Sequence, residues 1–164
     1  MFNFFAHENS RNGNCYSITG NDCNHIINVL RMKKGDQILI SHGNGSDLCA
    51  ISTLDSDVVT AEIIEENCKN TELNVNIFLF QGLPKSDKME LIIQKTVELG
   101  VHSIVPVEMS RCVVKLDEKK KKSKVSRWQA IAESAAKQSK RCIISEIKEG
   151  KNGVSIKLAD RMKA

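Results

Sequence analysis

The pattern of apolar residues changes near the middle of this 164-residue chain, and this change constrains the fold more than any other feature. Before it, short apolar stretches are separated by turn residues, as in small β domains. After it, Val75–Phe80 forms a continuous apolar run, typical of a strand covered on both faces. The polar run that begins at Asn67 separates the two patterns. We therefore predict two domains, residues 1–70 and 73–164.

The first domain is predicted to be a small β-barrel. Strands at 38–40 and 49–51 flank Asn44-Gly45, a pair that favours a type I′ hairpin turn because both residues accept positive φ. A further strand is expected at 58–64. Short strands with few interruptions are typical of small barrels.

One helix is expected to interrupt these strands. Either Asn21 or Asp22 is suited to cap its N-terminus, and Gly35 lies beyond its end. Its apolar stripe consists of Ile26, Ile27 and Leu30.

The second domain begins with the pattern of a βαβ unit. After the strand and the loop 81–85, Asp87 and Glu90 form a possible capping pair. The next residues with helical spacing are Met89, Ile93, Thr96 and Val97, with Gly100 at the position of a C-terminal cap. A strand at 102–107 completes the unit, so we expect a parallel sheet covered by helices.

A basic run, Lys119–Lys122, leads into another predicted helix at 124–139. The run is either a mobile, solvated loop or a segment that attracts phosphate groups without sequence preference. Trp128 falls on the apolar stripe of the helix, which favours a core position over a base-stacking role.

Charge is distributed unevenly along the chain. The formal net charge is +4. Residues 1–72 hold five basic and ten acidic side chains, a balance of −5, and the remaining residues have a balance of +9. This asymmetry indicates a polyanionic partner for the second half, although a solvated basic face would give the same count.

The rest of the sequence shows no pattern of a membrane span, a signal peptide or a metal site. No window approaches the roughly 18 apolar residues of a membrane span, and the N-terminus lacks a signal peptide pattern, so we expect a cytoplasmic protein. The six cysteines and four histidines show no metal-ligand spacing, so we expect unpaired thiols and no metal site.

Several basic residues are predicted to gather at one edge of the second domain. Ligands bind beyond the carboxyl ends of parallel strands, which places Lys85 and Arg111 on the same rim. The neighbouring helix would add Arg127, Lys137, Lys140 and Arg141. Each is equally compatible with an ordinary surface charge, and no phosphate loop or dinucleotide fingerprint is present.

Four motifs in this order resemble those of the RsmE-type methyltransferases, SPOUT-class enzymes that methylate N3 of a uridine in 16S ribosomal RNA. The most specific is Gly82–Glu90 followed by Gln94–Val101. The others are His25 with Val29–Arg31 and Gly35-Asp36, then Pro106 with Ser110-Arg111 and Val113–Lys115, and finally Arg127-Trp128 with Ile131-Ala132, Ala135-Ala136, Gln138-Ser139 and Arg141. Together they extend from His25 to Arg141.

The resemblance implies a fold and a reaction. The fold class is α/β with an all-β extension: an N-terminal PUA-like barrel, then the first half of a SPOUT-type parallel α/β domain, knotted in the family. The reaction uses S-adenosylmethionine, the substrate is 16S ribosomal RNA or the small subunit, and the family works as a homodimer.

The resemblance also implies roles for individual residues. Arg111 would stabilise the uracil anion formed when N3 loses its proton, helped by Gln138 and Arg141. Glu98 would either assist proton removal or simply end its helix. The cofactor would contact Leu83, Pro84 and Lys85. The expected RNA contacts are His25, Arg31, Lys33, Lys34, Arg127, Lys137 and Lys140.

The resemblance fades after about residue 146. The family continues for roughly half a domain more, and residues 150–164 do not align with it. We therefore expect most of the cofactor pocket to be missing from this chain, and the chain alone to be catalytically incompetent. The alternative is a non-catalytic RNA-binding protein that has lost the cofactor site.

Overall fold

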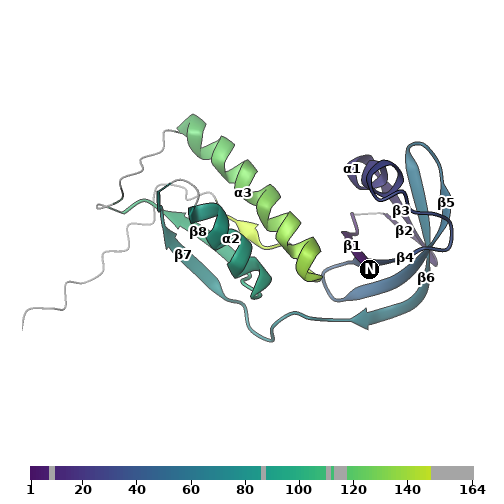
Figure 1. The fold of residues 1–164 in the computed structure, drawn as a ribbon. Helices are drawn as coiled ribbons and strands as arrows, with labels where there is room; N and C mark the ends of the chain where they lie inside the picture. Colours follow the sequence, from purple (N-terminus) through teal and green to yellow (C-terminus); the bar gives the residue numbers. More distant parts are fainter. Residues whose placement is uncertain (8–9, 86–87, 110–111, 113–117, 149–164) are drawn as a thin grey trace, which may run out of the picture. The chain divides into compact units, whose positions relative to one another are not determined.

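The computed structural model describes residues 1–7, 10–85, 88–109, 112 and 118–148. The chain divides into two compact units (Figure 1). The first comprises Met1–Asn74 together with Glu133–Ile144, and the second comprises Val75–Ala132 and the residues from Ser145.

The first unit is built on a six-stranded sheet. Its strands are β1 (Phe2–Phe5), β2 (Arg11–Asn12), β3 (Cys15–Thr19), β4 (Gln37–Ser41), β5 (Ser46–Leu54) and β6 (Val58–Lys69). Their order in the sheet is β1-β4-β5-β6-β3-β2. Only β1 and β4 pair in parallel among these neighbours, and the other pairs are antiparallel. The predicted small β domain is therefore confirmed.

The core of this unit consists of apolar side chains from the strands and from the helical segment that contains Ile26. Burial of such side chains is the main favourable contribution to folding. The fully buried set includes Ile26, Ile38, Ile40, Ile51 and Val59, each no more than 1% exposed.

The turn between β4 and β5 differs from the prediction. The loop comprises residues 42–45, and its positive φ is at Gly43 (90°), not at Asn44. The N–H of His42 donates to the carbonyl of Gly45 at 3.1 Å. A Cβ on Gly45 would lie 2.9 Å from Oδ1 of Asn67. Gly45 is therefore needed for a close approach to β6, and the predicted type I′ turn at Asn44-Gly45 is wrong.

The helical segment of the first unit begins earlier than predicted. Helix α1 spans Gly20–Asn24 and continues into a π-helix, η1 (His25–Val29). Thr19 precedes it, and no side chain caps it. Asn21 and Asp22 lie within the first turn, so the predicted capping by either residue is wrong.

The second unit contains the predicted βαβ arrangement. Its elements are β7 (Phe78–Gly82), α2 (Lys88–Glu98), β8 (Ser103–Val107), α3 (Glu118–Ser139) and β9 (Glu146–Ile147). The sheet order is β7-β8-β9, and both pairs are parallel. The last residues of α3, from Glu133, belong to the first unit.

The helical predictions in this unit rest on spacing and are confirmed. Met89, Ile93 and Val97 are buried on α2, and Gly100 has a φ of 96° after its end. Trp128 is 5% exposed, as expected for a core residue. The run Lys119–Lys122 lies inside α3, so the loop predicted there is wrong. The predicted cap Asp87 lies outside the described residues.

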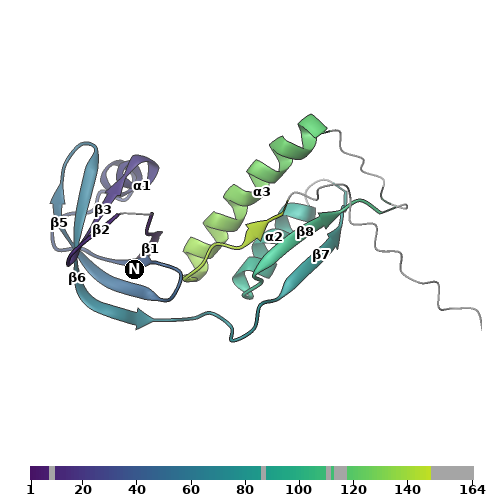
Figure 2. The same cartoon turned by 180° about the vertical axis from the view of Figure 1, so that it is seen from behind.

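Strand β7 is shorter and more exposed than its composition predicted. It begins at Phe78, and Val75 and Ile77 before it are exposed. Phe78 and Phe80 are each 48% exposed, although the continuous apolar run predicted burial on both faces. Figures 1 and 2 show α2 and α3 on the same face of the sheet, so that no helix of the described residues covers its other face.

Candidate functional site

The carboxyl ends of β7 and β8 lie side by side in the second unit. Gly82 is in register with Val107, and the N–H of Leu83 donates to the carbonyl of Val107 at 3.1 Å. A Cβ on Gly82 would lie 3.1 Å from Sδ of Met109. The loops that follow the two strands therefore begin at the same edge of the sheet, where ligands of open α/β sheets bind.

The residues predicted to contact the cofactor occupy the start of the first loop. Leu83 is 9% exposed, Pro84 is half-buried and Lys85 is exposed. The carbonyl of Lys85 accepts a hydrogen bond from the N–H of Lys88 at 3.3 Å. Arg111, predicted for the second loop, lies outside the described residues.

Two further predicted site residues of this unit form ion pairs with neighbours. Glu98 accepts a hydrogen bond from Lys95 Nζ at 2.9 Å, and this bond holds the pKa of Glu98 below its ordinary value. A lowered pKa weakens a carboxylate as a proton acceptor. Arg127 Nε lies 2.9 Å from a carboxylate oxygen of Glu90.

In the first unit, Arg141 follows the end of α3 and is buried. Its side chain is 4% exposed, and its guanidinium donates to Glu72 from Nε (3.2 Å) and Nη2 (2.5 Å). The same carboxylate accepts from the backbone N–H groups of Cys142 (2.7 Å) and Ile143 (3.2 Å). Glu72 thus holds the residues that follow α3, and we call this set of contacts the Glu72 clasp.

The pKa of Glu72 reflects opposing causes. Burial raises it, but the hydrogen bonds from Arg141 and from the backbone of Cys142 and Ile143 outweigh burial, so that the net pKa lies below the ordinary value. Hydrogen bonds to a carboxylate favour its charged form. The clasp therefore contains an ionised carboxylate at neutral pH.

The other predicted residues at the end of α3 differ in their surroundings. Gln138 is exposed. Lys137 lies 2.8 Å from Asp22 and 2.9 Å from Glu133, and these partners raise its pKa against the effect of burial. Lys140 is half-buried and has a φ of 57°.

The loop between η1 and β4 carries the remaining predicted RNA contacts. Arg31, Lys33 and Lys34 are exposed, and none of them takes part in the ion pairs found among the described residues. The backbone N–H of Lys33 donates to Asp36 at 2.7 Å, which shapes the loop. His25, at the start of η1, is exposed, with its ring edge-on to Phe4.

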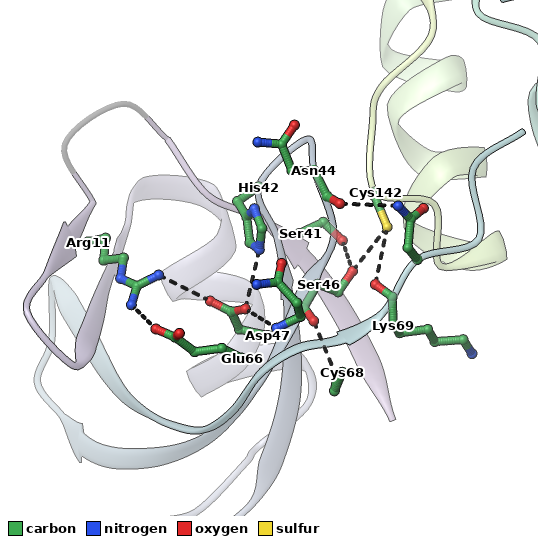
Figure 3. A network of polar contacts seen from close by, with 12 residues as sticks. Arg11, Ser41, His42, Asn44, Ser46, Asp47, Glu66, Cys68, Lys69 and Cys142 are labelled. Atoms are coloured by element: carbon green, nitrogen blue, oxygen red, sulfur yellow. Dashed lines mark hydrogen bonds and ion pairs between the residues drawn. The ribbon is translucent and has the colours of Figure 1, made fainter. Parts of the chain in front are cut away.

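A buried carboxylate, Asp47, organises a second polar network in the first unit (Figure 3). Its side chain is fully buried and accepts hydrogen bonds from Tyr16 Oη (2.9 Å) and the N–H of Asn67 (2.8 Å). Nε2 of His42 lies 3.2 Å away. Burial and this carboxylate raise the pKa of Tyr16 to about 12. Burial also raises the pKa of Asp47, but the hydrogen bonds lower it below its ordinary value overall.

Sequence reasoning did not single out Glu72 or Asp47. Both lie in polar stretches without periodicity, and their partners are distant in sequence: Glu72 and Arg141 are 69 residues apart. In the sequence, each of them is only a carboxylate beside an apolar segment. That pattern is too common to indicate a buried, hydrogen-bonded carboxylate.

Among the residues that the structure describes, no three His, Cys, Asp or Glu side chains are grouped so that they could hold a metal ion. Within the same residues, no helix is long and apolar enough to cross a membrane.

Comparison with known families identifies both units. A family model for an RNA methyltransferase domain matches residues 71–157, and one for an RNA methyltransferase PUA domain matches residues 18–64. The chain belongs to the RNA methyltransferase family. The resemblance drawn from the four motifs is therefore confirmed, as is the fold class of a PUA-like domain followed by a parallel α/β unit.

Individual members of this family match along much of the chain. The ribosomal RNA small subunit methyltransferase E of Bacillus subtilis is 46% identical over 127 residues, which cover 77% of this chain and 50% of that protein. The crystal structure of the same-named protein from Neisseria gonorrhoeae, bound to S-adenosyl methionine, has a TM-score of 0.77 at 34% identity. It covers 90% of this chain and 61% of its own.

A methyltransferase from Legionella pneumophila, in complex with the cofactor SAM, has a TM-score of 0.76 at 29% identity. It covers 90% of this chain and 61% of its own. The chain spans about half the length of the curated relatives that it matches.

Proposed function

We propose that this chain serves the S-adenosylmethionine-dependent methylation of N3 of a uridine in 16S ribosomal RNA. The observation that carries the proposal is the ordered match of a PUA domain and an RNA methyltransferase domain. The relatives are named ribosomal RNA small subunit methyltransferases, and two similar structures contain the cofactor. We further propose that the functional domains are residues 1–70 and 73–164.

The residues at the carboxyl edge of β7 and β8 fit part of the cofactor in their chemistry. S-adenosylmethionine, when bound, supplies a methyl group on a positively charged sulfur. Leu83 and Pro84 offer apolar surface suited to its adenine, and the exposed ammonium of Lys85 is suited to its carboxylate. We propose these three residues as cofactor contacts.

The substrate imposes a second requirement. The N3–H of uracil must lose its proton before the N3 lone pair can form a bond to carbon, and the resulting negative charge spreads over the ring. Arg111 is proposed to stabilise that charge, and the exposed amide of Gln138 to orient the base. Arg141 is proposed to help to orient the base while it remains paired with Glu72. Glu98 is the proposed proton acceptor, although its pairing with Lys95 makes it a weak one.

RNA is proposed to reach the chain through phosphate contacts that position it without reading sequence. The exposed loop residues Arg31, Lys33 and Lys34 suit this role best, because no acidic partner is seen for them among the described side chains. His25 and Lys140 are proposed as further contacts. Arg127 and Lys137 already pair with carboxylates and would have to exchange those partners.

We also propose that the 164-residue chain does not methylate RNA by itself, and that the active form is a homodimer. Phe78 and Phe80 remain about half exposed on one face of the sheet, which is an unusual position for adjacent aromatic side chains unless another element covers them. The alternative function, a non-catalytic RNA-binding protein, is favoured by the exposed basic loop in the first unit.

Calorimetric titration of S-adenosylmethionine into the chain tests the cofactor contacts. We expect no saturable binding by the chain alone. Binding at roughly micromolar affinity, about −8 kcal/mol, would instead show that the residues present suffice for a pocket, and the proposed incompetence would be wrong. A chimera tests the reaction: residues 1–148 of this chain joined to the remaining part of the Bacillus subtilis relative, with small-subunit RNA as substrate.

A further inference from the structure

The turn that follows α3, residues 140–143, is fixed by contacts from several segments of the first unit. The carbonyl of Arg141 accepts hydrogen bonds from Asn3 Nδ2 (3.2 Å) and Ser41 Oγ (3.0 Å). The N–H of Gly43 donates to the carbonyl of Cys142 at 3.0 Å. The backbone of this turn is therefore bound to the loop and strands of the sheet.

The Glu72 clasp closes the turn from the other side. One carboxylate accepts from the guanidinium of Arg141 and from two successive backbone N–H groups, at 2.5 to 3.2 Å. Arg141 is 3% exposed as a residue. Charge-assisted hydrogen bonds of this kind are stronger than neutral ones, and a planar guanidinium fixes geometry as well as charge.

Lys140 is the left-handed residue of the cap that ends α3. Its φ of 57° lies in the left-handed region, which a lysine rarely adopts. The N–H of Arg141 donates to the carbonyl of Ala136 at 3.0 Å, and the N–H of Lys140 donates to the carbonyl of Lys137 at 3.2 Å, the pattern of a Schellman motif. Thr71 Oγ1 donates to the carbonyl of Lys140 at 3.1 Å, from the residue directly before Glu72. The segment Thr71-Glu72 thus contacts both this cap and the turn that follows it.

We propose that Glu72 is a positioning residue for RNA binding. Through the clasp it fixes the end of α3, so that the side chains of Gln138 and Lys140 point toward RNA in one arrangement. This inference rests on the proposed function, which places RNA at this end of the helix. Within it, Glu72 acts through the turn rather than by touching the base.

Removing the charge of Glu72 should change RNA binding in the direction opposite to that expected from electrostatics alone. Glu72 is a negative charge near a surface that is to bind a polyanion. If its charge were all that mattered, neutralising it would strengthen RNA binding. If it positions Lys140, the substitution Glu72→Gln weakens binding, although no positive charge is removed.

The experiment measures binding of the 164-residue chain to a fluorescently labelled, uridine-containing RNA stem-loop over a range of salt concentrations. Glu66→Gln is the matched control, because it also removes one carboxylate paired with an arginine in the first unit, but on the surface. We expect E66Q to bind as well as the wild type or slightly better. E72Q should bind several-fold more weakly, with the slope of log K against log salt reduced by about 1, as for loss of one phosphate contact.

Two further variants complete the test. Lys140→Ala should reproduce the loss seen in E72Q, and the double variant should lose little more, since both changes remove the same contact. Glu72→Asp keeps the charge but shortens the side chain, and it replaces E72Q if that variant folds poorly. The same reduced slope of log K against log salt is expected for it. Circular dichroism checks that each variant is folded.

The binding results distinguish a failure of positioning by Glu72 from a failure of RNA binding itself. If E72Q binds RNA as tightly as E66Q with an unchanged salt slope, the positioning role is wrong while RNA binding stands. If the wild-type chain shows no saturable binding, the proposed RNA contact itself fails, and the positioning role fails with it.

Discussion

Replacing Asp47 by alanine should destabilise the first unit strongly, because this buried carboxylate accepts hydrogen bonds from Tyr16 and from the backbone of Asn67. The side chain of Asp47 is fully buried, and Tyr16, which donates to it, is 2% exposed. The N–H of Asn67 donates to the other carboxylate oxygen. Asp47→Ala therefore leaves a buried hydroxyl and a backbone N–H without their acceptor.

The expected magnitude follows from these two donors. An unsatisfied buried donor costs about 1–3 kcal/mol. The hydroxyl of Tyr16 belongs near the upper end because it is buried, and the N–H of Asn67 near the lower end because Asn67 is exposed. Removing a buried charge offsets part of the loss. We expect a decrease of about 3 kcal/mol in the free energy of unfolding, a large part of the ~5–15 kcal/mol that domains possess.

The assay is urea unfolding at pH 7, followed by circular dichroism. Fluorescence of the single tryptophan, Trp128, would report on the second unit instead. Glu66→Ala is the control, with an expected cost below about 1 kcal/mol for an exposed pair. Tyr16→Phe combined with Asp47→Ala should cost less than the two single changes added together. A loss in D47A no greater than that in E66A would refute the reasoning.

Two other predictions concern pH and backbone. The pKa values of Asp47 and Glu72 in the folded protein are both lowered. The two ionised carboxylates therefore stabilise the folded protein at pH values above their pKa values in the unfolded chain, about 4. This stability is lost as the pH falls through their pKa values in the folded protein. Urea unfolding should show a smaller decrease between pH 7 and acid in E72Q than in the wild type, and an equal decrease would argue against the clasp. Gly43→Ala places a Cβ at a φ of 90° in open space and should cost about 1–2 kcal/mol from strain alone. Gly82→Ala meets only the flexible end of Met109 and should cost less, and the reverse order of the two melting temperatures would contradict this account.

Local sequence patterns were sufficient to predict much of the fold. The spacing of Met89, Ile93 and Val97 placed the buried face of α2, and Gly100 marked its end, because helical periodicity and capping depend on neighbouring residues. The parallel pairing of β7 with β8 followed from the βαβ order. The turn prediction failed where tertiary contacts decide: Gly45 lies close to Asn67 of β6, and the positive φ of the turn is at Gly43.

The candidate site was less accessible to sequence reasoning. Leu83 to Lys85 could be placed at a strand end, since that edge follows from topology. The surroundings of Arg141 could not, because its partner Glu72 is brought near only when β6, the following segment and the end of α3 meet in the first unit. The exposure of Phe78 likewise depends on what covers a sheet face, which its apolar neighbours do not specify.

The most direct test of the proposed function is nucleoside mass spectrometry of small-subunit ribosomal RNA after incubation with the chimera and S-adenosylmethionine. The RNA should come from a strain without this modification, with Gln138→Ala in the same chimera as the matched variant. We predict N3-methyluridine at one position, strongly reduced in the Q138A variant. A folded chimera that binds the RNA but yields no N3-methyluridine would contradict the account and favour a non-catalytic RNA-binding protein.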